Sequence, residues 1–165
     1  MQIPSSILSL KGRALRYLAA REHSRAELER KLAPHLPPDG DGAVELARVL
    51  DELTAKGLIS EARVAESVLH RRAGRLGNAR VLHELRAKVL SEDVLADAAD
   101  HLRATELARA RQVWQTRFGQ PPQNAAEQAR QMRFLASRGF SGDVIRRVFA
   151  AADDDTWQQD QDATD

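Results

Sequence analysis

The chain of 165 residues contains no cysteine, few aromatic residues and few β-branched residues. The lack of cysteine excludes disulfides and thiolate metal sites. Ten valines, four isoleucines and five threonines are too few to build a sizeable sheet. No apolar run approaches the roughly 20 residues that a membrane-spanning helix needs, and the N-terminus lacks a secretory pattern. We therefore expect a soluble, cytoplasmic protein.

Residues that favour helices are abundant instead, with 27 alanines, 20 leucines and 21 arginines. Apolar residues recur at helical spacing, as at Leu46, Val49 and Leu50. Ser24 and Glu27 have the spacing of a capping box, in which each side chain accepts from a backbone N–H at the start of a helix. These patterns predict an all-α chain of about nine helices joined by short connections.

A repeat runs through this helical pattern. Residues 80–95 and 130–145 align without a gap at an offset of 50, and a third copy fits at an offset of 53, where Leu32 matches Leu85. Small helical units that repeat must stack to bury their apolar faces, which favours an elongated body over a sphere. We expect three tandem three-helix repeats in an elongated, curved body. The predicted units are residues 1–57, 58–102 and 103–152, followed by an acidic, disordered tail at 153–165.

The net charge of +1 conceals a separation of charge along the chain. Residues 103–149 hold nine arginines against three carboxylates, whereas residues 150–165 hold six aspartates and no cation. A basic body favours an anionic partner. The alternative is that the arginines only cover solvated helix faces, and charge alone leaves both interpretations open.

Motifs for catalysis or metal binding are missing from the sequence. The five histidines form no HExxH or HxxxH pattern, and no GxSxG, Walker A or Rossmann glycine motif occurs. Carboxylate pairs such as Asp51 and Glu52 lie on helix faces that we expect to be solvated. We therefore expect no enzyme activity, no cofactor and no metal.

A binding surface is the remaining candidate for function. Arginine is the informative cation, because its planar fork fits phosphate or carboxylate. Trp114 and Phe118 lie four residues apart, which indicates a core stripe rather than a base-stacking platform. The predicted partner-binding residues are the dense basic stretch and the exposed arginines of the last unit: Arg71, Arg72, Arg75, Arg80, Arg86, Lys88, Arg130, Arg133, Arg146 and Arg147.

Three segments resemble the RecX family of bacterial recombination regulators: residues 13–32, 49–66 and 134–148. Their order and spacing extend the resemblance over about residues 9–150. The resemblance implies an all-α fold of three tandem three-helix repeats. It also implies binding to the RecA recombinase, chiefly as its filament on single-stranded DNA, with suppression of ATPase, strand-exchange and co-protease functions in recombination, DNA repair and the SOS response. One departure is Val89, where the family often has glycine.

An elongated helical monomer could lie along the groove of such a filament and contact neighbouring protomers at once. Weak contacts from separate units would then combine through effective concentration. Weak direct contact with DNA is left open by the sequence. The alternative functions are a stand-alone regulator that reads DNA with a helix-turn-helix-like unit, and a helical scaffold that binds no nucleic acid.

Overall fold

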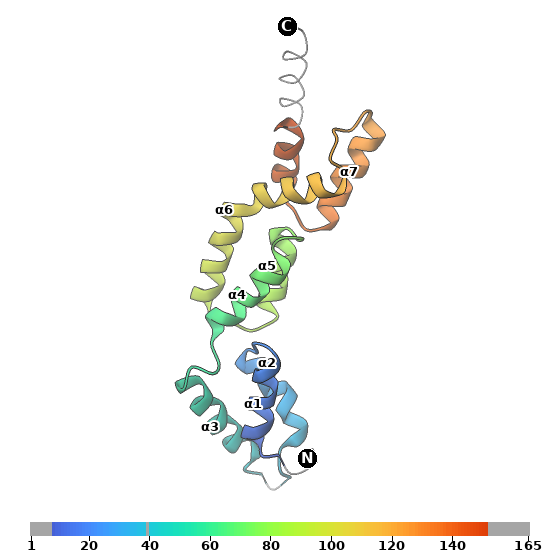
Figure 1. The fold of residues 1–165 in the computed structure, drawn as a ribbon. Helices are drawn as coiled ribbons and strands as arrows, with labels where there is room; N and C mark the ends of the chain where they lie inside the picture. The colour runs from blue at the N-terminus through green and yellow to red at the C-terminus, as the bar shows by residue number, and fades with distance from the viewer. Residues whose placement is uncertain (1–7, 39, 152–165) are drawn as a thin grey trace.

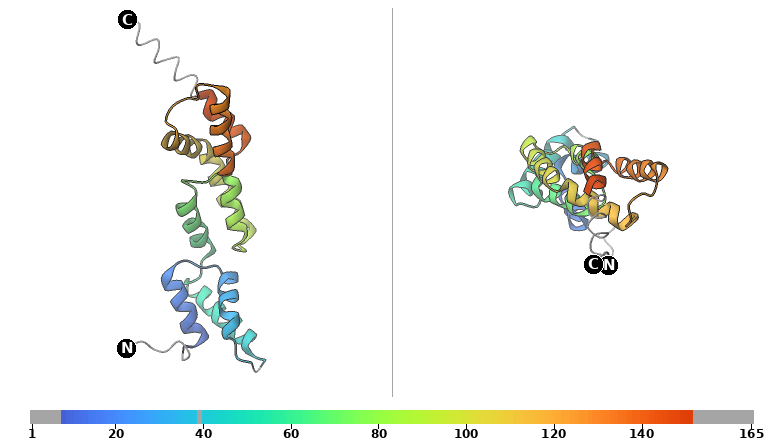
Figure 2. Two further views of the ribbon diagram at one scale, coloured as in Figure 1. Left: turned by 90° about the vertical axis from the view of Figure 1, so that its right-hand side faces the viewer. Right: turned by 90° about the horizontal axis from the view of Figure 1, so that it is seen from above.

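The computed structural model describes residues 8–38 and 40–151, and every regular element in these ranges is helical. The helices form an elongated stack, with α1 at one end and the helical segment 142–151 near the other (Figure 1). Figure 2 shows the same column from the side and a small cross-section from above. The predicted all-α, elongated fold is confirmed. No helix within the described ranges is long and apolar enough to cross a membrane.

Three separate clusters of buried apolar side chains lie along the stack. The first core is formed by α1 (Leu10–Ala20), α2 (Arg25–Leu32) and α3 (Gly42–Ala55), with the 3₁₀ turn η1 (Ala33–His35) after α2. Leu28, Leu32, Leu50 and Leu53 are fully buried, and their spacing is the helical spacing expected from the sequence. The predicted capping box at Ser24 and Glu27 is present and starts α2.

The second core lies in the middle of the stack. It is formed by α4 (Glu61–Arg72), α5 (Asn78–Arg86) and the first part of α6 (Glu92–Arg117). Val81, Leu85 and Leu102 have no exposed surface. Burying a side chain of this size contributes about 1.5–3 kcal/mol, so a few such residues hold each small unit together.

The third core contains the remainder of α6, α7 (Ala125–Ser137) and the helical segment 142–151. It holds every buried phenylalanine and tryptophan of the described residues: Trp114, Phe140 and Phe149. Trp114 is buried, as its spacing predicted, and its indole N–H donates to Gln131 at 2.8 Å. Phe118 is half-buried at the end of α6.

The helix α6 differs from the prediction, because one element of 26 residues replaces two separate helices. It runs through the expected boundary between residues 102 and 103 and changes direction along its length (Figure 1). Two side chains bond to backbone carbonyls near this point: Thr105 Oγ1 donates to His101 at 2.9 Å, and Arg109 donates to Leu102 at 3.0 Å. Side chains that bond to helical carbonyls in this way favour a bend. The predicted acidic tail at 153–165 lies outside the described residues.

Candidate cationic interface

The predicted partner-binding cations lie on the surface of the second and third cores. Nine of the ten side chains are exposed, and Lys88 is the half-buried exception. Three of the ten form ion pairs with other described residues. Arg72 pairs with Glu84 at 2.9 Å, and exposed Arg146 pairs with Asp143 at 3.2 Å.

Lys88 is held in a junction between cores. Its side chain is 16% exposed, and Nζ lies 2.7 Å from Oε1 of buried Glu27. Burial by itself would raise the pKa of Glu27, but hydrogen bonds from Arg21, from Lys88 and from the Ser24 N–H outweigh burial and lower the pKa to about 2. With the nearby pair between Arg63 and Glu22, at 3.0 Å, these ion pairs form the N-terminal junction between the first and second cores. The Lys88 amino group is therefore held by this junction.

The second and third cores meet at a different kind of contact, the C-terminal junction. Gly77 N–H donates to the carbonyl of Arg138 at 2.9 Å, and Ala79 N–H donates to Gly139 at 3.2 Å. A Cβ at Gly77 would lie 2.2 Å from the backbone of Gly139, so no other residue fits without a shift. Gly139 itself has φ 88°, in the left-handed region.

Two charged side chains of α6 complete the C-terminal junction. Buried Glu106 accepts at 3.3 Å from the N–H groups of Asn78 and Ser141, which begin two different helices, where the helix dipole favours a carboxylate. Arg109 donates to the carbonyls of Ala73 at 2.9 Å and Leu76 at 2.7 Å. Burial lowers the pKa of Arg109, against the opposing effect of Glu106.

A recess of about 350 Å³ opens beside the C-terminal junction, and we call it the intercore cleft. Arginines from three segments line it: Arg75 from the turn after α4, Arg117 from the end of α6 and Arg138 from the residue after α7. A second recess of about 320 Å³ shares Arg117 and adds Arg130. The full lining of the cleft is Gly74, Arg75, Gln112, Val113, Thr116, Arg117, Phe134 and Arg138.

Two phenylalanines hold two of the three arginines of the intercore cleft, Arg117 and Arg138. The guanidinium of Arg138 lies 4.9 Å from the centre of the Phe134 ring, and that of Arg117 lies 5.6 Å from Phe118 and 6.0 Å from Phe134. The two rings meet edge to face at 5.3 Å. Such cation–π contacts keep a guanidinium in place while its N–H groups stay free to bind an anion.

The four arginines of the two recesses form no ion pair in the part of the chain that the structure describes. No carboxylate there lies within 4.0 Å of Arg75, Arg117, Arg130 or Arg138. No acidic residue lines either recess. The recesses therefore form a concentrated positive site.

Sequence reasoning found half of this site. It singled out Arg75 and Arg130, but not Arg117 or Arg138, and it did not foresee the roles of Glu106 and Arg109. Arg130 and Arg138 are eight residues apart in and just after α7, which places them on one side of the helix with Phe134 between them. That spacing is a signal in the sequence. The approach of Arg75 and Arg117 depends on the bend of α6 and on the Gly77–Gly139 contact.

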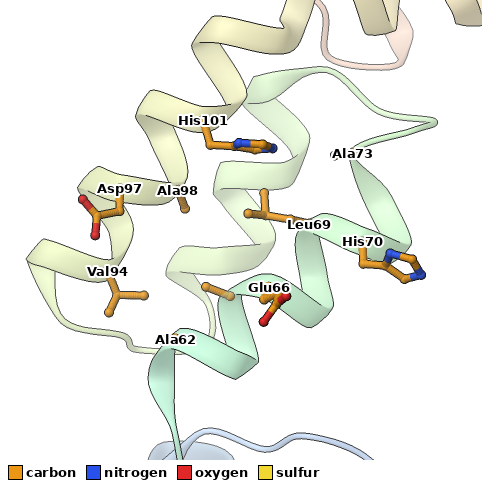
Figure 3. A pocket seen from close by; sticks show the side chains of 10 residues that line it. Ala62, Glu66, Leu69, His70, Ala73, Val94, Asp97, Ala98 and His101 are labelled. Atoms are coloured by element: carbon orange, nitrogen blue, oxygen red, sulfur yellow. The ribbon is translucent and has the colours of Figure 1, made fainter.

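A larger groove, of about 510 Å³, has the opposite character (Figure 3). It lies between α4 and α6, with alanines and Leu69 along its floor. Glu66 and Asp97 line it together with His70 and His101, and no lysine or arginine does. No group of three or more potential metal ligands occurs in residues 8–38 and 40–151.

Comparisons with known proteins agree with this architecture. The family model described as the third three-helix domain of RecX matches residues 104–149, and the model of the first three-helix domain matches residues 11–36. A crystal structure of RecX from Lactobacillus salivarius superimposes with a TM-score of 0.71 at 20% identity, covering 92% of this chain and 99% of that chain. At this identity the superposition establishes the fold alone.

Curated relatives are similar over nearly the whole chain. The regulatory protein RecX of Leptothrix cholodnii is 62% identical over 146 residues, which are 88% of this chain and 90% of the relative. The regulatory protein RecX of Ralstonia nicotianae is 49% identical over 153 residues, which are 93% of this chain and 94% of the relative. Both names describe a regulator and indicate no catalytic activity. With similarity this high over this length, the chain belongs to the RecX family of regulatory proteins.

Proposed function

We propose that this chain binds the RecA recombinase, chiefly as its filament on single-stranded DNA, and inhibits ATPase, strand exchange and co-protease activity. Family membership supports the regulatory role. The observation that carries the proposal is an elongated body whose second and third cores expose arginines without acidic partners in the described residues. Such a body can reach neighbouring protomers of a filament, where several weak contacts combine into tight binding.

We propose further that the units predicted from the repeat, residues 1–57, 58–102 and 103–152, each contribute separate contacts. On this view only one unit can bind a free RecA monomer, whereas several units can bind neighbouring protomers of the filament at the same time. This protein should therefore bind the RecA filament much more tightly than it binds the RecA monomer, and low concentrations of it should inhibit the filament. Occupation of the filament groove would exclude the homologous duplex and the clients of the co-protease activity.

The partner-binding residues follow from the exposed cations of the second and third cores. We propose that Arg71, Arg75, Arg80 and Arg86 contact an anionic surface of the filament, either acidic RecA side chains or DNA phosphate. The footprint would continue over the third core to Arg130, Arg133 and Arg147. Arg72 and Arg146 can join after releasing their exposed ion pairs, because such pairs stabilise the fold by only about 0–1 kcal/mol.

An ATPase assay of RecA on single-stranded DNA, titrated with this protein, tests the proposal. The wild type should suppress ATP hydrolysis, and Arg71→Glu/Arg75→Glu should need at least about tenfold more protein for the same suppression. The control is Arg16→Glu/Arg30→Glu, which changes the net charge equally at two exposed helix positions outside the named contact residues and should leave the suppression unchanged. Circular dichroism must show that both variants stay folded.

Two outcomes would contradict the proposal. The first is full inhibition by the folded Arg71→Glu/Arg75→Glu variant, which would remove this surface from the mechanism. The second is sequence-specific binding to naked duplex DNA without any effect on RecA, which would favour the stand-alone DNA-binding regulator. A salt series run without RecA detects the second case, because binding to phosphates weakens steeply as salt rises.

A further inference from the structure

We infer that the intercore cleft is a binding site for a ligand with two linked phosphate groups. One phosphate would sit among Arg75, Arg117 and Arg138, and the next would lie in the second recess between Arg117 and Arg130. This inference deepens the proposed function, because it assigns direct phosphate recognition to one defined site. The role of that site in filament binding rests on the proposed function. Linked phosphates occur in a nucleic-acid strand and in a free nucleotide, and the experiment below separates these sources.

The arrangement of donors fits phosphate better than carboxylate. Three arginines from three segments of the chain line the same recess, and the side-chain amide of Gln112 lines it as an uncharged donor. The Thr116 hydroxyl already donates to the Gln112 carbonyl at 2.8 Å. A tetrahedral phosphate presents oxygens in several directions, whereas a planar carboxylate is matched by a single guanidinium fork. The positive charge is also left uncompensated, since no carboxylate in the described residues lies within ion-pair distance of these arginines.

Two of the three arginines of the cleft are held in place before a ligand arrives. Phe134 and Phe118 hold the guanidiniums of Arg138 and Arg117, and the Arg138 carbonyl is fixed by the Gly77 N–H at 2.9 Å. Side chains that are already placed lose little conformational entropy on binding. Because the Phe118 and Phe134 rings already pack against arginines, we expect the site to bind phosphate groups and not to distinguish base sequences.

The test measures binding with RecA absent. Fluorescence anisotropy follows the full-length protein with fluorescein-labelled oligo-dT and, separately, with a fluorescent ATP analogue. Arg117→Gln/Arg138→Gln should weaken binding of the phosphate ligand at least about tenfold. It should also lower the salt dependence of oligo-dT binding by about one to two in logarithmic slope, because two phosphate contacts are lost.

The matched control is Arg16→Gln/Arg30→Gln, which removes two exposed arginines of the first core and changes the net charge equally. It should weaken binding less than twofold. Binding of oligo-dT alone identifies a nucleic-acid strand as the source, and binding of the ATP analogue alone identifies a free nucleotide. Either result supports the inference if the cleft variant loses that binding while remaining folded.

Three results would overturn the inference: no binding of either phosphate ligand, an equal loss in both double variants, or displacement of the bound ligand by poly-glutamate as effectively as by unlabelled oligo-dT. The last result would identify the cleft as a site for acidic protein. RecA inhibition, measured in parallel, keeps the two proposals apart. A wild type that binds phosphate but leaves RecA ATPase unchanged defeats the proposed function and leaves this site intact.

Discussion

The two junctions of the stack are built from different parts of the chain. The N-terminal junction joins its cores through side-chain ion pairs, Glu27 with Lys88 and Glu22 with Arg63. The C-terminal junction uses backbone hydrogen bonds between Gly77 and Arg138 and between Ala79 and Gly139, and α6 runs through it without interruption. A backbone contact has few alternative geometries, whereas long side chains can adjust. The comparison indicates one fixed joint and one adaptable joint.

The difference between the two junctions explains where the candidate site lies. The intercore cleft lies at the fixed joint, where its three arginines come from separate segments that the Gly77–Gly139 contact and the course of α6 bring together. A site assembled from separate segments needs a rigid frame, because small displacements weaken several bonds at once. Under the proposed function, the adaptable joint would let the first core adjust its position when the other two cores bind the filament.

The largest expected effect comes from breaking the C-terminal junction with Gly77→Ala. The added Cβ would lie 2.2 Å from the Gly139 backbone, which cannot move without separating the cores. We expect a loss of at least about 3 kcal/mol in the free energy of unfolding, measured by urea denaturation. Gly74→Ala is the control, because a Cβ there meets nothing within 4 Å, and it should change stability by less than about 1 kcal/mol. Equal stability of the two variants would refute the fixed joint.

A smaller effect should follow from titrating the N-terminal junction. The pKa of Glu27 is about 2 in the folded chain, below the ordinary value of 4.5. Because the pKa of Glu27 is lower in the folded chain than in the unfolded chain, its ionised side chain stabilises the fold at pH values above about 4.5. This stability is lost as the pH falls from about 4.5 towards 2. The wild type should therefore lose about 2 kcal/mol more than Glu27→Gln between pH 5 and pH 2.5, measured by chemical denaturation at each pH. Parallel curves for the two proteins would show that Glu27 does not act as an ion-pairing group.

The smallest expected effect is a gain in stability from Val89→Gly. Val89 has φ 55°, and the repeat alignment places it opposite Gly139, which has φ 88°. A β-branched residue is strained in this region, and the Val89 side chain is 66% exposed, so it buries little apolar surface. Glycine removes the backbone strain at this position, but it also makes the unfolded chain more flexible, which costs conformational entropy on folding. The net effect should raise the free energy of unfolding by about 0.5–1 kcal/mol. Thermal melting would measure it, and a lower melting temperature would disprove strain at this residue.

The sequence was sufficient for the fold class and for many local details. Helical spacing predicted buried residues such as Leu50 and Leu85, and the Ser24–Glu27 spacing predicted a real capping box. These features depend on residues a few positions apart, whose relation is set by the geometry of one helix. The same reasoning separated α6 into two helices, because a bend supported by side-chain bonds to carbonyls leaves no simple pattern in sequence.

The candidate site shows the limit of that reasoning. Charge density in the sequence selected Arg75 and Arg130 together with Lys88, but the structure commits Lys88 to Glu27. Whether a cation is free depends on which carboxylate lies beside it in space, and Glu27 is 61 residues away along the chain. Arg117 and Arg138 join the site for the converse reason, since no carboxylate of the described residues reaches them.

The sequence by itself determined that this chain folds as stacked helical units with an arginine-rich surface, because helix periodicity, capping and composition act over short distances. The tertiary structure decided which arginines stay available and where they meet. That decision rests on the glycine contact and on the course of α6, which bring distant segments together, and long-range packing of this kind is not written in any local pattern.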